Sequence, residues 1–141
     1  MGYRVLVVED EWLLAVTLRG QLESLGHEVV GLASTGLEAI EQCRTRHPDI
    51  VLMDVQMPKM DGLEATRSIM RDFPTCVVIV TGNALLAAQA GAAGAAGYVV
   101  KPLQASQIDG VLAAACRRFQ ARRDSVRRPR LRERALTPKP A

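Results

Sequence analysis

The sequence predicts an α/β fold in which a doubly wound, five-stranded and mainly parallel sheet is covered by helices on both faces. Two observations predict it: short apolar runs typical of buried strands recur five times, and segments with helical apolar spacing lie between them. Parallel strands need crossover connections, which such helices provide. With 141 residues the chain suits one domain that buries about two thirds of its unfolded surface.

The five expected strands are rich in Val, Ile and Leu. They are Val5–Val8, Val29–Ala33, Ile50–Met53, Val77–Val80 and Tyr98–Val100. Continuous apolar runs of this length are typical of strands that are covered on both faces of a sheet. The carboxyl ends of parallel strands then meet at one edge, which is where open α/β sheets form their sites.

The positions of the helices are predicted from the spacing of apolar residues and from the residues that end each helix. The first is expected over about residues 11–25, where four leucines form one stripe and Gly26 suits the C-terminus. The second and third are expected over about residues 36–46 and 63–72, and each stops two residues before a proline. The last helix is expected to begin near Ser106.

The fourth helix is expected to be short or partly melted. The segment between Thr81 and Lys101, GNALLAAQAGAAGAAGYVV, holds no charged residue, and each glycine within a helix costs about 1 kcal/mol relative to alanine. Two interpretations of this segment stay open. It is either an Ala/Gly-rich stretch without a role or an apolar surface for a partner.

Charge divides the chain into an acidic part and a basic tail. Residues 1–116 hold 8 Lys and Arg against 13 Asp and Glu, a net charge of −5, whereas residues 117–141 hold 10 against 2, a net charge of +8. We expect the last helix to end near Arg123, because Pro129, Pro138 and Pro140 argue against regular structure beyond it. A solvated, disordered tail is favoured over one that binds nucleic acid.

The sequence also indicates a compartment. The N-terminus shows no signal peptide and no long apolar segment, so we expect a cytoplasmic protein without a membrane span. Its three cysteines, at positions 43, 76 and 116, are widely spaced and odd in number. This favours small buried thiols over a disulfide framework or a zinc site.

Charged and polar residues follow the expected strands at their carboxyl ends. Glu9 and Asp10 follow the first strand, Asp54 the third, Thr81 the fourth and Lys101 the fifth. Taken singly, each has an ordinary structural interpretation, such as a helix N-cap or a solvated charge. Together they predict a site, because clustered carboxylates repel unless a cation such as Mg²⁺ neutralises them, and a carboxylate beside a cation can act as a nucleophile toward phosphorus.

The motifs VVEDE, LMDVQMPKMDG, VTGN and GYVVKP, in this order and spacing, resemble the receiver domain of two-component response regulators. The resemblance covers roughly residues 3–118, leaves residues 119–141 as a basic Arg/Pro-rich tail, and implies the flavodoxin-like receiver fold. It implies that Asp54 is the phosphoacceptor and that Glu9 and Asp10 hold Mg²⁺. The backbone carbonyl of Gln56 would complete the metal site.

The resemblance also assigns roles at the other strand ends. Thr81 matches the hydroxyl that moves toward the phosphoryl group, Lys101 the cation that binds it, and Tyr98 the aromatic residue whose rotamer changes with it. Pro102 matches the proline that follows the lysine through a cis peptide bond. The segment between Thr81 and Lys101 is about two residues shorter than is usual in the family, which makes the helix boundaries there less certain than the acidic site.

The resemblance implies a single-domain response regulator and not a turnover enzyme. Its phosphoryl donor would be a sensor histidine kinase or a histidine phosphotransfer protein. It would signal through protein contacts of the face made by the fourth helix, fifth strand and fifth helix, and this face is also a candidate for homodimerisation. Two alternatives remain: a receiver that gates a nucleic-acid-binding basic tail, and an unrelated α/β phosphohydrolase with Asp54 as nucleophile.

Overall fold

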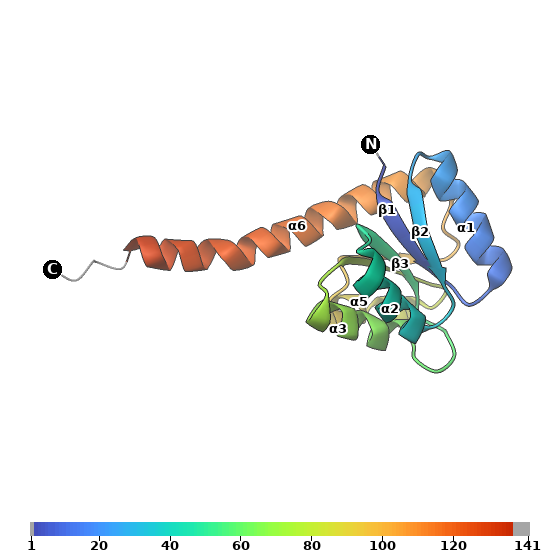
Figure 1. Cartoon of the computed structure of the whole chain (residues 1–141), viewed down its shortest axis with the longest axis horizontal. Coiled ribbons are helices and arrows are strands. Elements are labelled where there is room, and N and C mark those ends of the chain that lie inside the picture. Colours follow the sequence, from blue (N-terminus) through green and yellow to red (C-terminus); the bar gives the residue numbers. More distant parts are fainter. Residues whose placement is uncertain (1, 137–141) are drawn as a thin grey trace.

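The computed structural model describes residues 2–136, with the side chains of residues 2–125, and contains a five-stranded parallel sheet flanked by helices (Figure 1). The strand order is β2-β1-β3-β4-β5, and every pairing is parallel. The strands are β1 (Arg4–Val8), β2 (Glu28–Ala33), β3 (Ile50–Asp54), β4 (Cys76–Thr81) and β5 (Gly97–Val100). The predicted fold class is therefore confirmed.

The helices lie between the strands, as the apolar spacing predicted. They are α1 (Trp12–Ser24), α2 (Gly36–Arg46), α3 (Gly62–Asp72), α4 (Ala84–Ala87), α5 (Ala90–Ala93) and α6 (Ala105–Leu136). The expected fourth helix is thus two helices of four residues each. Asn83 caps the first of them through its side-chain oxygen, and Gly94 ends the second with a φ of 100°, a conformation that favours glycine.

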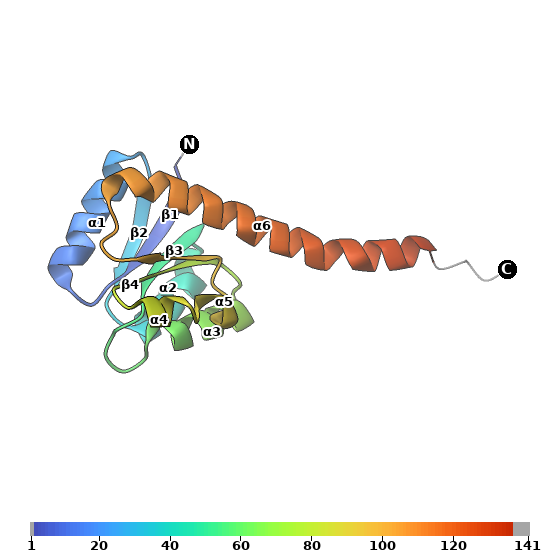
Figure 2. The ribbon, with the colours of Figure 1, turned by 180° about the vertical axis from the view of Figure 1, so that it is seen from behind.

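Helices cover both faces of the sheet (Figures 1 and 2). Side chains that alternate along the strands form two apolar layers, one on each face. One layer joins β1, β3 and β4 to α2, α3 and α5, with Ala39, Ile69 and Ala90 among its buried residues. The other joins the same strands to α1 and α6, and includes Leu22 and Leu112. Because both faces are covered, the strand termini are left as the places where polar groups gather.

The register of the strands aligns their carboxyl ends. Val8 of β1 pairs with Met53 of β3, and Asp54 pairs with Val80 of β4. The last residues of β3 and β4 and the residues that directly follow β1 and β5 therefore lie along one edge of the sheet. This edge carries the polar residues that the sequence indicated.

The last helix is longer than expected. We expected it to end near Arg123, but α6 continues to Leu136 and passes through Pro129 (Figure 1). The surrounding residues are mainly Arg, Ala, Leu and Glu, which have high helix propensities, so a single interior proline does not end the helix. Pro138 and Pro140 lie outside the described residues.

The length and hydropathy of the helices show whether any of them could cross a membrane. Within residues 2–136, none of the helices, α6 included, has both the length and the apolar character that a transmembrane span requires.

Candidate functional site

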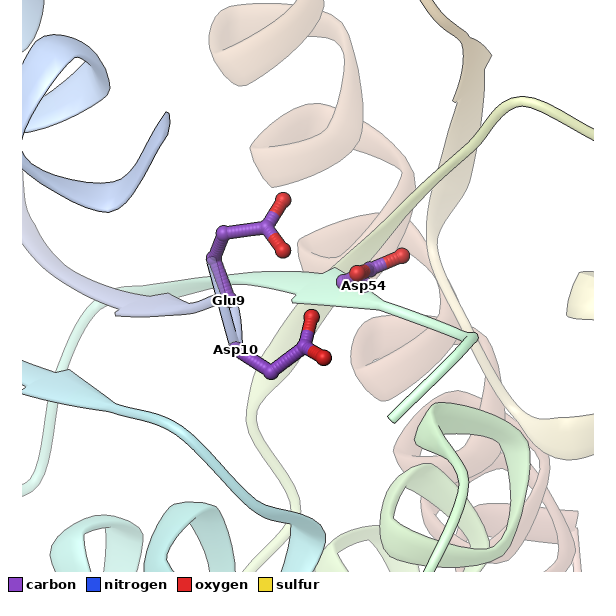
Figure 3. A group of neighbouring side chains, drawn as sticks. All are labelled: Glu9, Asp10 and Asp54. Atoms are coloured by element: carbon purple, nitrogen blue, oxygen red, sulfur yellow. The ribbon is translucent and has the colours of Figure 1, made fainter. Parts of the chain in front are cut away.

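Three carboxylates gather where β1 and β3 end (Figure 3). One oxygen each from Glu9, Asp10 and Asp54 lies within 4.8 Å of the others. Glu9 and Asp54 are buried, with 9% and 7% of their surface exposed, whereas Asp10 faces solvent. The sequence predicted this grouping, and the parallel register explains it.

Lys101, which directly follows β5, contacts this cluster. The Nζ of Lys101 donates a hydrogen bond to Glu9 Oε1 at 3.0 Å and lies 3.7 Å from Asp54 Oδ1. Its backbone N–H donates to the carbonyl of Thr81 at 2.7 Å, which ties the end of β5 to the end of β4. The Lys101–Pro102 peptide bond is cis, as the sequence resemblance implied.

Burial and mutual repulsion change the acidity of these carboxyl groups. Burial, reinforced by the neighbouring Glu9, raises the pKa of Asp54 to about 6, and the charge of Lys101 opposes this rise only in part. Burial also acts to raise the pKa of Glu9, but the hydrogen bond from Lys101 holds it below its usual value. Burial and the charge of Glu9 raise the pKa of Asp10.

The donor set fits a hard divalent cation. Three carboxylates face a single ammonium group, so the cluster has an excess of negative charge that disfavours full ionisation without a further cation. Oxygen ligands of this kind suit Mg²⁺, which keeps several waters and takes few protein ligands. Gln56, whose carbonyl is the fourth predicted ligand, lies two residues beyond Asp54, and its N–H donates to Asp54 Oδ1 at 3.4 Å.

Gly62 explains how the chain returns so close to Asp54. It begins α3, and its N–H donates to the carbonyl of Val55 at 3.0 Å. A Cβ on Gly62 would lie 2.1 Å from the backbone oxygen of Asp54, so only glycine fits without displacing the end of β3. Asp61 caps α3 by accepting a hydrogen bond from the N–H of Glu64 at 2.9 Å.

The two predicted switch residues lie outside the cluster. Thr81 is fully buried at the end of β4, and its hydroxyl oxygen accepts a hydrogen bond from the N–H of Asn83 at 3.2 Å. Tyr98 on β5 has 57% of its surface exposed. Neither is among the residues that line the cleft beside Asp54.

That cleft has a volume of about 440 Å³ and an apolar wall that the sequence analysis missed. Glu9, Asp54 and Lys101 form one part of its lining, while Leu14 and Leu18 of α1 contribute to another. The sequence places those leucines on one apolar stripe of the helix, and within that stripe Leu14 is 42% exposed. The sequence did contain a signal of this exposure. Trp12, Leu13 and Leu14 are consecutive, and one face of a helix cannot bury three consecutive apolar residues.

Comparison with known proteins assigns the family. The model of the response regulator receiver domain matches residues 5–113. The chemotaxis protein CheY of Thermotoga maritima is 39% identical over 111 residues, which cover 77% of this chain and 92% of that protein. The transcriptional regulatory protein PdtaR of Mycobacterium tuberculosis is also 39% identical, over 119 residues, and the chain spans 58% of that longer protein.

A solved structure shares the fold. It is the receiver domain of the sensor histidine kinase PA1611 from Pseudomonas aeruginosa, with a magnesium ion coordinated in its active site cleft. The TM-score is 0.74 with 28% sequence identity, and the match covers 82% of this chain and 98% of that one. Since the family model spans most of the chain and the fold agrees, this chain belongs to the response regulator receiver domain family.

Proposed function

We propose that Asp54 accepts a phosphoryl group and that the chain works as a phosphorylation-controlled signalling protein. The observation that carries this proposal is the setting of Asp54: a buried carboxylate at the end of a central strand, beside two other carboxylates and 3.7 Å from the Lys101 ammonium. Such a carboxylate is a nucleophile held among groups that bind phosphoryl oxygens.

In the proposed transfer, a carboxylate oxygen of Asp54 attacks the phosphorus of a phosphoimidazole. An oxygen–phosphorus bond forms, the phosphorus–nitrogen bond breaks, and the imidazole leaves with the bonding electrons and takes up a proton. Lys101 would hold one phosphoryl oxygen, and the hydroxyl of Thr81 would donate to another after turning from its contact with Asn83.

Glu9, Asp10, Asp54 and the backbone carbonyl of Gln56 would hold Mg²⁺ in this proposal. When bound, the ion would neutralise charge on the phosphoryl oxygens, which together with positioning is what phosphoryl transfer requires. The magnesium-containing cleft named for the PA1611 receiver domain supports this assignment.

The proposed phosphoryl donor is a sensor histidine kinase or a histidine phosphotransfer protein. Trp12 and Leu13 at the start of α1 are 72% and 75% exposed and lie close in sequence to the acidic pair. They would offer an apolar contact for the donor next to the cleft. The three free cysteines suit a reducing compartment, and we place the protein in the cytoplasm.

The proposed output is a shift in population between two conformers. Phosphorylation would draw the hydroxyl of the buried Thr81 toward the phosphoryl group, turn Tyr98 inward, and change the surface formed by α4, α5, β5 and α6. Leu85 and Tyr98 are 79% and 57% exposed on these elements, so the surface has apolar anchors for a downstream protein or for a second copy of the chain. In this account the chain signals and does not turn over a substrate.

Phosphate-affinity gel electrophoresis after treatment with acetyl phosphate tests the site. We expect a Mg²⁺-dependent mobility shift that is lost in Asp54→Asn and strongly reduced in Asp10→Asn. Asp72→Asn, which removes an exposed carboxylate on α3, is the matched control and should shift like the wild type. An undiminished shift in Asp54→Asn would refute the assignment.

A further inference from the structure

The end of α6 projects from the rest of the molecule. Its first part packs on the sheet through buried Ile108 and Leu112. Farther along, Arg122 Nη1 donates to the carbonyl of Ala95 at 2.9 Å, which ties this part of the helix to the segment before β5. Beyond that contact the ribbon extends away from the sheet (Figures 1 and 2). We name residues 124–136 the α6 arm; at 1.5 Å per residue it is about 20 Å long.

The charge of this region is opposite to that of the domain. Residues 117–136 contain nine arginines and two acidic residues, whereas residues 1–116 carry a net charge of −5. Four pairs of arginines are separated by four residues along the helix, a spacing at which like charges repel and destabilise an isolated helix. A polyanionic ligand would remove this repulsion and stabilise the helix.

The positions of the arginines distinguish between kinds of polyanion. Within the arm they are at positions 127, 128, 130, 132 and 134. At 3.6 residues per turn these positions cover roughly 200° of the helix circumference, which is wider than a single stripe. A flat acidic protein surface meets one side of a helix, whereas the major groove of DNA presents phosphates on both sides of it. The distribution therefore favours a groove.

The absence of aromatic residues from the sequence of the arm argues against single-stranded nucleic acid, which proteins bind largely by base stacking. The major groove of B-form DNA is about 12 Å wide and admits an α-helix, while the groove of A-form RNA is too narrow. We propose that the α6 arm binds double-stranded DNA in the major groove through phosphate contacts. The proposal does not depend on phosphorylation of Asp54.

Fluorescence anisotropy of a labelled B-form DNA duplex with the full chain tests the proposal. About five phosphate contacts predict a loss of affinity of roughly 500-fold when salt rises from about 50 to about 200 mM. The triple variant Arg127→Gln, Arg128→Gln and Arg130→Gln should reduce that loss to roughly 10-fold.

The matched control removes the same charge from the domain. Arg44, Arg67 and Arg71 are exposed on α2 and α3, and their replacement by glutamine should leave the binding and its salt dependence near those of the wild type. The proposal is overturned if both triple variants lose binding equally, if a duplex RNA of the same sequence binds as tightly as the DNA, or if the full chain shows no binding at low salt.

Discussion

Replacing Asp54 by asparagine is expected to stabilise the fold at neutral pH when divalent cations are absent. Burial and Glu9 raise the pKa of Asp54 from its usual 3.8 to about 6, so ionising this group costs more in the folded protein than in the unfolded chain. The unfolded chain loses its proton first, and the stability of the wild type therefore falls as the pH rises between these two values.

The size of the stability difference follows from the shift in the pKa of Asp54. Two pH units correspond to about 3 kcal/mol, and we expect about 1–3 kcal/mol because the cleft is open to water and screens the charge. The asparagine variant lacks this titration and keeps the contact between Lys101 and Glu9 at 3.0 Å. The free energy of unfolding of the variant should exceed that of the wild type above about pH 6 and approach it near pH 4.

Urea denaturation between about pH 4 and pH 8, in the presence of a chelator, measures the difference. Addition of Mg²⁺ should reduce the difference in free energy of unfolding between the variant and the wild type, because the ion binds the folded wild type through Asp54 and stabilises it. The reasoning is refuted if the variant is no more stable than the wild type at neutral pH, or if its advantage is the same at all pH values.

Three further changes have defined outcomes. Gly62→Ala places a Cβ 2.1 Å from the backbone oxygen of Asp54 and should destabilise the fold by about 1–3 kcal/mol in urea titrations. Gly20→Ala adds a methyl group in open space on α1 and should stabilise the fold by up to about 1 kcal/mol. Similar effects of the two substitutions would contradict the close packing of Gly62 against Asp54. Lys101→Gln should slow phosphorylation by acetyl phosphate about 100-fold in a timed gel assay, and an unchanged rate would remove Lys101 from the site. Burial raises the pKa of Cys43 to about 12, so iodoacetamide near pH 8 should leave this thiol unmodified in the folded protein, and labelling found by peptide mass spectrometry would show that it is accessible.

The sequence was sufficient to place the site because parallel sheets impose a simple geometry. Once the apolar runs were taken as parallel strands, the residues at the carboxyl ends of β1, β3 and β5 had to lie along one edge, and Glu9, Asp54 and Lys101 are found there. The acidity of Asp54 could not be predicted in the same way. It depends on the distances to Glu9 and Lys101 and on burial, which the order of residues does not give.

For two helices the sequence alone was insufficient, for physical reasons. Helical spacing showed that α1 has an apolar face, but it could not show that part of this face, including Leu14, lines a cleft instead of the core. For α6, the weight given to Pro129 was too large, since the neighbouring residues favour a helix strongly enough to continue through it. The exposure of Tyr98 likewise depends on tertiary packing at the short helices α4 and α5.

The central claim, that Asp54 is the phosphoacceptor, is tested most directly by intact-mass spectrometry after incubation with acetyl phosphate. The account predicts a gain of one phosphoryl mass that requires Mg²⁺, is lost on treatment with base, and is absent from Asp54→Ala. Borohydride reduction followed by peptide sequencing should place the modified residue at position 54. A stable adduct on another residue, or an adduct that persists in Asp54→Ala, would contradict the account.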